Sequence, residues 1–509
     1  MSRPIKAALI CLPLAGLALP VSADITADDV WSNLDAAIAA LGGTSRADLV
    51  RSGDTVAVTG HEMLFNLPLG LGEFAVKSDG FTLIETDGTV QIGYPTPYNM
   101  QIRGEIYGEG AFVLDVVMEI EDHTTEASGE PGAISYVTSA GRATMAVTDL
   151  ELETGAEIGE IELDAGITID GMSSEFRVVE DTLIVIYSRS EIGETTTDFT
   201  FSDGAGTYSE SRSVAGPAVS IGNMGLIPGG ADILNLTAAL NDGMYISIES
   251  ASGASTTETL TRIDGEVVQE QDYAFDGNDA TFSFDKSAIE MSGAVSGLLF
   301  NALMPPGTRP ASIGFDASEI GLSFKMPLLA SDMPQDFGIG FNLQDLRLGP
   351  SIWALFDPEK VLPRDPATLD VDFGGEMILG ADLPDLLALS EMGGAEEVPI
   401  QITSVDIARL ALSALGMRAD SSGQFELDYD NLSALPGVPW PYGSGRAEVE
   451  GLNQGLDRLI QLGVIGEEEV FGIRMLIRLG TVSQGDDLLT SEIELTEDGD
   501  IIANGQQLR

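Results

Sequence analysis

The sequence is nearly free of the side chains that do most enzyme chemistry. It has one cysteine, Cys11, and two histidines, His61 and His123, in 509 residues. Beyond residue 11 the chain therefore offers no disulfide, no thiolate metal site and no cysteine nucleophile. Two isolated histidines provide too few ligands for a zinc or copper site, and the sequence has no G-x-S-x-G motif of a serine hydrolase. We predict that the protein is not an enzyme, and we interpret both histidines as turn residues.

Basic and aromatic residues are also scarce. The chain has 24 Lys and Arg against 81 Asp and Glu, which gives a net charge of -57. Such a charge repels nucleic acid and anionic headgroups, so a nucleic-acid-binding role is excluded. Aromatic residues make up 6% of the chain and hydrophobic residues 44%. We therefore predict a globular chain whose core is mainly aliphatic, with its acids on the solvated faces of strands.

The first residues have the pattern of a secretory signal peptide. Arg3 and Lys6 precede an apolar run over 7–19, and the small residues at 21–23 match a cleavage site after Ala23. The run is shorter than the about 20 residues that a spanning helix needs. We predict a signal peptide over 1–23, no transmembrane segment after cleavage, and a periplasmic location, with secretion as the alternative. A retained anchor is the other interpretation of this segment.

What the chain does contain is a long series of strand and turn signals. Segments 111–122 and 175–191 are rich in β-branched residues, the second reading as two strands around residues 180–181. Asp-Gly pairs, which supply the positive φ of tight hairpins, recur at 79–80, 87–88, 203–204, 242–243, 264–265 and 276–277. We predict a mainly β (β-rich α+β) fold of elongated, curved antiparallel sheets.

Helical spacing marks the start of the exported chain and several later segments. Thr26 and Asp29 form a capping-box pattern before apolar residues at 30, 31, 34, 38 and 41, and a helix that packs as a plug or lid is expected there. Further helices are predicted at 293–304, 351–358, 383–392, 452–463 and 467–480. We divide the chain into a β-rich lobe over 24–290 and a β-rich lobe with helices over 291–509. The Pro/Gly stretch 435–445 is predicted to be an irregular loop.

The candidate sites are pairs of like-charged residues. Carboxylates two apart occur at 370/372, 428/430 and 498/500, where they could hold a hard cation or form the wet face of a sheet. Arg474 and Arg478 lie four apart in the last predicted helix and are candidates for contact with a membrane surface or anionic partner. The alternative is that they pair with acids at 467–469. No motif indicates a cofactor or a metal.

The last residues, 489–509, read as a strand and turns. Polar residues at 490, 492, 494 and 496 alternate with Ser491, Ile493 and Leu495, and a turn follows at 497–499. Residues 501–502 can pair back, and Asn504-Gly505 offers a second tight turn. We predict that this segment completes a sheet.

Three segments carry a family resemblance: LPRDPATLDVDFGG (362–375), PGVPWPYGSGRAEVEGLNQGLDRLIQLGVI (436–465) and LLTSEIELTEDGDIIANGQQLR (488–509). They resemble an alphaproteobacterial envelope family, domain of unknown function 2125. More distantly, the β-rich build and the hairpin ending are similar to AsmA-like envelope proteins. That resemblance implies a long curved sheet with an apolar concave side that handles lipid, and it implies no catalytic residue.

Three functional hypotheses follow. The first is a non-enzymatic envelope factor whose curved sheets hold lipid or acyl chains in an apolar groove. The second is a protein-binding or scaffold module that contacts other envelope proteins through sheet edges. The third is a carboxylate-based hydrolase of envelope glycans, which needs two facing acids in a cleft.

Overall fold

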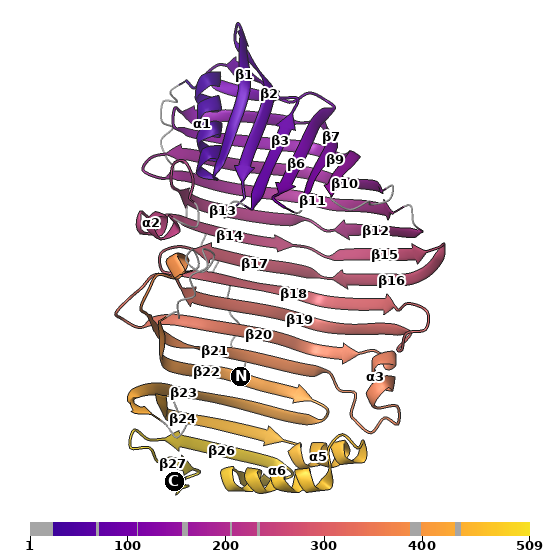
Figure 1. Ribbon diagram of the computed structural model, residues 1–509, viewed down its shortest axis with the longest axis vertical. Coiled ribbons are helices and arrows are strands. Elements are labelled where there is room, and N and C mark those ends of the chain that lie inside the picture. The colour runs from indigo at the N-terminus through magenta and orange to yellow at the C-terminus, as the bar shows by residue number, and fades with distance from the viewer. Residues whose placement is uncertain are drawn as a thin grey trace.

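The protein folds around one continuous antiparallel sheet (Figure 1). The computed structural model describes residues 24–67, 71–108, 110–154, 161–203, 206–231, 235–386, 399–432 and 439–508. In Figure 1 most strands run side by side across the view and follow one another from the indigo N-terminal end to the yellow C-terminal end. The prediction of a mainly β, antiparallel fold with an N-terminal helix and short later helices is confirmed.

The elements have the following bounds. The helices are α1 (Ala27–Ala40), α2 (Leu236–Asn241), α3 (Pro350–Phe356), α5 (Leu452–Gln461) and α6 (Glu467–Gly480). The strands up to residue 226 are β1 (Gly43–Ser52), β2 (Thr55–Asn66), β3 (Gly72–Ser78), β4 (Phe81–Thr86), β5 (Thr89–Gly93), β6 (Tyr98–Ile106), β7 (Gly110–Glu121), β8 (Thr124–Glu130), β9 (Ala133–Thr154), β10 (Glu162–Glu180), β11 (Ile184–Ser202), β12 (Thr207–Ala215) and β13 (Ala218–Leu226). The later strands are β14 (Tyr245–Ser252), β15 (Ser255–Ile263), β16 (Glu266–Phe275), β17 (Gly277–Phe284), β18 (Ala288–Leu303), β19 (Ser312–Pro327), β20 (Gln335–Leu348), β21 (Ala367–Leu379), β22 (Ile400–Ala414), β23 (Met417–Leu432), β24 (Pro439–Glu450), β25 (Val482–Gly485), β26 (Leu488–Leu495), β27 (Ile501–Ala503) and β28 (Gln506–Gln507).

Most of the sheet is built in chain order. From β18 to β24 each strand pairs with the next one along the chain, and β26, β27 and β28 continue the series. At two places the series of strands splits into two branches. The long strand β18 pairs with both β16 and β17, and the long strand β9 pairs with both β7 and β8. The two branches that start at β18 rejoin at β11, and the two that start at β9 rejoin at β2. The sheet therefore stays continuous although its strands differ in length.

The N-terminal end of the sheet curls over and encloses α1. Figure 1 shows β1, β2, β3 and β6 crossing β9, β10 and β11, and α1 contacts strands of both layers. Val30 of α1, Val58, Leu83, Tyr136 and Val178 are among the buried members of the core at this end. A helix that buries one stripe between two sheet layers is a standard way to close a core.

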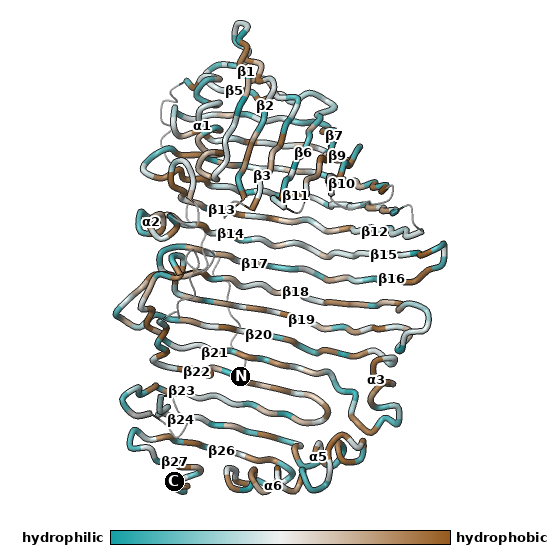
Figure 2. The backbone as a smooth tube through the Cα atoms, viewed as in Figure 1, coloured by the Kyte–Doolittle hydropathy of each residue, from teal (hydrophilic) through white to brown (hydrophobic). Residues whose placement is uncertain are grey.

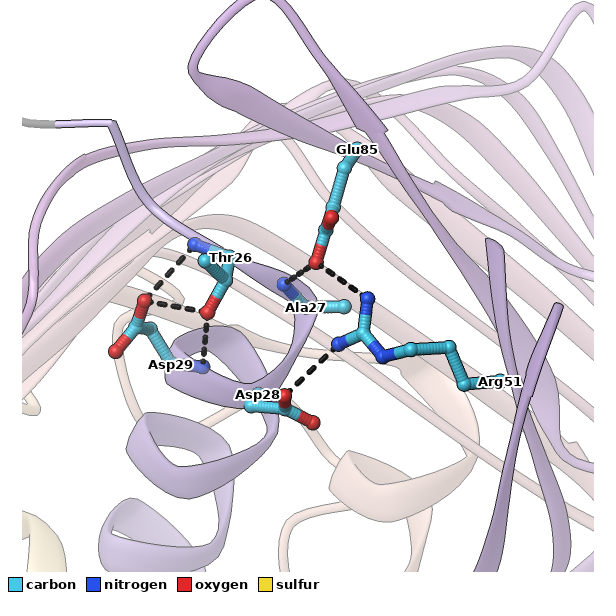
Figure 3. Close-up of polar contacts among 6 residues, drawn as sticks. All are labelled: Thr26, Ala27, Asp28, Asp29, Arg51 and Glu85. Atoms are coloured by element: carbon cyan, nitrogen blue, oxygen red, sulfur yellow. Dashed lines mark hydrogen bonds and ion pairs between the residues drawn. The ribbon is translucent and has the colours of Figure 1, made fainter. Parts of the chain in front are cut away.

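A network of polar contacts fixes the start of α1 (Figure 3). Thr26 and Asp29 form the predicted capping box. The Ala27 amide donates to Glu85 of β4 at 2.8 Å, and this hydrogen bond lowers the pKa of Glu85. Arg51 of β1 reaches Glu85 at 3.0 Å and Asp28 at 2.8 Å. The first turn of α1 is thus tied to both strands above it.

Beyond this curled end the sheet is thin. The accessible surface is 29754 Å², whereas a compact monomer of 53.5 kDa would expose about 18,000 Å². Within the described part of the chain, the buried members of the core cluster all come from residues 25–244. Most of the later strands therefore expose side chains on both faces.

Several sequence predictions of helices are confirmed, and one is wrong. The helices α1, α3, α5 and α6 lie where they were predicted. The segment 293–304 is not a helix but the second part of β18, paired with β19 along its length. Its run of adjacent apolar residues hides the strand period, and pairing with neighbours decides the conformation. Residues 383–386 are helical, while the rest of the predicted helix 383–392 lies outside the described residues.

The turn predictions are confirmed only in part. The Asp-Gly pairs at 87–88 and 264–265 close the β4–β5 and β15–β16 hairpins with both residues at positive φ. The pairs at 79–80, 242–243 and 276–277 join elements that do not pair with each other. Residues 439–445 of the predicted loop belong to β24. Residues 1–23, 204 and 435–438 lie outside the described residues, and the proposed boundary at residue 290, which falls in β18, stays a prediction.

Candidate functional site

One face of β19, β20, β21 and β22 is apolar across all four strands. Residues paired across antiparallel strands lie on the same face of the sheet. Three cross-strand rows here contain only apolar side chains. We call this surface the apolar face: Ile320, Leu343, Leu369 and Leu412; Leu322, Phe341, Val371 and Leu410; Phe324, Ile339, Phe373 and Ile407. Brown segments recur along these strands in Figure 2.

The side chains of the apolar face are open to solvent. Leu322 is 51% exposed, Ile339 is 47% exposed, and Leu410 and Leu412 are each 44% exposed. Met291 of β18, which pairs with Phe324, continues the surface and is 42% exposed. Isolated exposed leucines are ordinary on protein surfaces, but contiguous ones mark interaction sites.

The apolar face is a sizeable patch for a single protein. It crosses the four strands β19 to β22, about 19 Å at ~4.8 Å per strand, and three alternating positions extend about 20 Å along each strand. The resulting area of about 400 Å² is typical of the largest apolar patch on a monomer, and such patches are often functional.

The opposite face of the same strands carries the charges. Asp370 of β21 pairs with Arg409 of β22 at 2.8 Å. Lys325 of β19 pairs with Glu290 of β18 at 3.1 Å. In β19, β20 and β21 large apolar residues occupy every second position, and in β22 a bulge between Ile407 and Leu410 keeps both residues on the same side. One face of these strands is therefore apolar and the other is solvated.

The candidate pair Arg474 and Arg478 lies on α6 with two different environments. Arg474 donates to the Asn453 side chain at 3.1 Å and pairs with Asp457 of α5 at 2.8 Å. Its acidic partner is therefore on α5 rather than at 467–469, where Glu469 instead accepts from the Gly466 amide. Arg478 is exposed and has no ion pair among the described side chains. Arg474 holds two helices together, and Arg478 stays a candidate for surface contact.

The interpretation of His61 as a turn residue is wrong. It lies inside β2, is 7% exposed, and sits between the hydroxyls of Ser45 and Ser78 at 3.4 and 3.2 Å. Trp31 and Phe81 contact its ring edge to face, and burial lowers the pKa of His61. The strand places this ring in the core, where serine hydroxyls can satisfy both nitrogens.

The remaining residues that the sequence singled out form no shared site. His123 lies in the turn between β7 and β8, as predicted. Asp370 and Asp372 lie on the charged face of β21, Asp428 accepts from the Asp430 amide at 2.9 Å, and Asp500 accepts from Gln507 at 2.8 Å. In the described ranges, no group of three or more His, Cys, Asp or Glu residues could hold a metal ion.

A buried carboxylate that the sequence analysis missed follows α3. Asp357 is 0% exposed, accepts from the amides of Val361 and Leu362 at 2.8 and 3.0 Å, and pairs with Arg364 at 3.0 Å. The Arg364 guanidinium lies 3.8 Å from the centre of the Trp353 ring. Burial opposes ionisation, but the amides of Leu362 and Val361 and the charge of Arg364 outweigh it and lower the pKa of Asp357. These contacts hold the segment after α3 in a fixed conformation.

We expect Asp357→Asn to destabilise the protein at pH 7 and the difference from wild type to shrink below about pH 4. An unfolded aspartate has a pKa of about 3.9. Because the folded pKa is lower, the stabilisation is fully present above that value and is lost as the pH falls through the folded pKa. Urea unfolding of both proteins at pH 7, 5 and 3 measures the difference. If the free energies of unfolding of the two proteins differ by the same amount at all three pH values, the charge of Asp357 does not contribute to stability.

Within the described ranges, no helix combines the length and hydropathy that crossing a bilayer requires. Comparison with known proteins finds no significant match among family models, curated proteins or solved structures. The resemblance to domain of unknown function 2125 and to AsmA-like proteins therefore stays a prediction from the sequence.

Proposed function

We propose that the protein is an exported, non-enzymatic factor of the bacterial cell envelope that holds lipid acyl chains on its apolar face. The observation that carries the proposal is the set of three apolar cross-strand rows with four of its leucines and isoleucines 44–51% exposed. Holding these side chains against acyl chains removes them from water, at about 25 cal/mol for each Å² covered.

The dimensions and chemistry of the face suit acyl chains. The hydrocarbon core of a bilayer is about 30 Å thick for two leaflets, so one chain is about 15 Å long. The apolar face, about 20 Å by 20 Å, accommodates such chains along either direction. None of its twelve residues carries a charge or a hydrogen-bonding side chain, so the surface selects for apolar bulk rather than for a headgroup.

A second copy of the chain is a poorer occupant of this surface. Two copies each bearing a net charge of -57 repel one another when their faces approach. Lipid tails are uncharged and meet no such barrier. The predicted signal peptide and the predicted resemblance to lipid-handling envelope proteins agree with this choice.

The proposal predicts that the protein carries lipid when it is purified from its native envelope. Gentle isolation, organic extraction and mass spectrometry should recover acyl lipids in roughly stoichiometric amount from folded protein. A protein of similar size and charge from the same preparation serves as the control. A folded sample free of lipid that instead retains an envelope protein would overturn this function in favour of the scaffold alternative.

A further inference from the structure

Helix α6 carries an apolar arc that faces solvent. Phe471, Met475, Leu476 and Leu479, which we call the α6 arc, are 67%, 54%, 71% and 65% exposed. At about 100° per residue they span roughly 140° of the helix surface. A surface helix normally turns such an arc toward the core. The residue that α6 buries is Val470, on another side of the helix.

The rest of the protein holds α6 in this orientation. Arg474 pairs with Asp457 of α5 at 2.8 Å. At the end of the helix the Gly480 carbonyl accepts from the Ser491 hydroxyl at 2.7 Å and from the Asn504 amide at 2.9 Å. These contacts attach one side of α6 to α5, β26 and the turn after β27. The α6 arc is therefore presented outward by a fixed helix.

The attachment point lies on the apolar side of the sheet. Leu410 of the apolar face pairs with Ser421, Ser421 with Ala447, and Ala447 with Ser491. Ser491, which binds the Gly480 carbonyl, thus belongs to the same cross-strand row as Leu410. The end of α6, at the yellow end in Figure 1, and the apolar face on β19 to β22 therefore share one side of the sheet.

We propose that the α6 arc inserts into the surface layer of a lipid bilayer and holds the apolar face, which ends three strands away at β22, near that membrane. This inference rests on the proposed function, because it supplies the place where acyl chains meet the sheet. Phe and Leu on one side of a helix insert about 5–10 Å into the boundary between headgroups and acyl chains. Binding is driven by the apolar side chains, because Arg478 is the single basic residue on α6 without an ion pair in the described structure.

The charge of the protein gives this contact an unusual salt dependence. Basic amphipathic helices bind anionic membranes less well as salt rises. Here the body carries a net charge of -57 and is repelled by anionic lipid, so salt should strengthen binding by screening that repulsion. Zwitterionic vesicles lack the repulsion and should bind the protein at low salt.

The test is flotation of the purified full chain with phosphatidylcholine vesicles and with vesicles containing 30% phosphatidylglycerol, at ~20 mM and ~300 mM salt. The double variant Leu476→Glu, Leu479→Glu should float at least about tenfold less well than wild type, since each leucine loses a favourable transfer. The matched control, Gln461→Glu with Gln506→Glu, adds the same charge at exposed positions nearby and should float like wild type. Binding to the anionic vesicles should rise with salt.

Binding of a fluorescent fatty acid in solution is measured on the same proteins. If the α6 variant binds the fatty acid like wild type but no longer floats, both proposals stand. If it floats like wild type, or if wild type floats with neither vesicle, the membrane inference is overturned while fatty-acid binding still supports the proposed function. If wild type binds no fatty acid, the proposed function fails. Light scattering that shows a dimer in wild type and a monomer in the α6 variant would assign the arc to self-association and overturn the inference.

Discussion

The double substitution Leu322→Glu, Leu410→Glu should weaken binding of a fluorescent fatty acid by about a hundredfold. The two leucines lie in the same row of the apolar face and are 51% and 44% exposed. Covering an ionised carboxylate with an acyl chain, without a partner for its charge, costs several kcal/mol, and ~2.7 kcal/mol corresponds to a hundredfold change in affinity. Titration of the purified variants with the fluorescent fatty acid measures the change.

The matched control adds the same two charges to the opposite face. Ser323 follows Leu322 on β19 and Ser444 lies on β24, and both are exposed on the polar side of the sheet. Ser323→Glu with Ser444→Glu should leave the affinity for the fatty acid within about twofold of wild type, because surface substitutions of this kind change little. Equal weakening by both double variants would assign the effect to total charge and would remove the apolar face from the mechanism.

The largest effect on stability is expected from Asn33→Leu. Asn33 of α1 is 0% exposed; it donates to Glu180 at 2.7 Å and accepts from the Tyr136 hydroxyl at 2.9 Å. Leucine has a similar size but takes the acceptor away from the buried Tyr136 hydroxyl, at about 1–3 kcal/mol, and removes the hydrogen bond to the solvent-exposed Glu180 carboxylate, at about 1 kcal/mol. We expect a loss of about 3 kcal/mol, seen as roughly a hundredfold faster amide exchange in β9 and β10 by mass spectrometry.

Two further variants separate the hydrogen bonds from general disturbance. Asn241→Leu, at the exposed end of α2, should change exchange in β9 very little. Tyr136→Phe removes the hydroxyl that Asn33 accepts from. The double variant Asn33→Leu, Tyr136→Phe should therefore lose less stability than the sum of the losses of the two single variants. Full additivity of the two would mean that the Asn33–Tyr136 hydrogen bond contributes nothing.

The sequence predicted the elements whose signals are local. Thr26 and Asp29 mark the start of α1 through a three-residue spacing, and α6 begins and ends at the predicted residues. The strand β18 was missed because its apolar residues change position within it. Before Gly297, which has φ 64°, the large apolar side chains alternate at Ile289, Met291 and Val295, whereas after it Leu298, Leu299 and Phe300 follow one another directly. The combined pattern resembles a helix, and only pairing with β17 and β19 resolves it.

The apolar face was predictable strand by strand but not as a surface. Alternation in β20 and β21 is visible in the sequence, yet a shift of one residue in register would move every side chain to the other face. Which strand lies beside which is decided by contacts between residues distant in the chain. For the same reason the sequence could not show that His61 lies against Trp31, or that Arg474 meets Asp457 rather than Glu467–Glu469.

The chain-order pairing from β18 to β24 has an evolutionary consequence. Each of these strands depends on two neighbours, so the series behaves like a linear array in which stability is a sum of local terms. Insertion or loss of one hairpin would change the length of the sheet by about 10 Å and leave the pairs on either side intact. The length of the sheet in such a protein can therefore change by duplication of a short segment while the fold is kept.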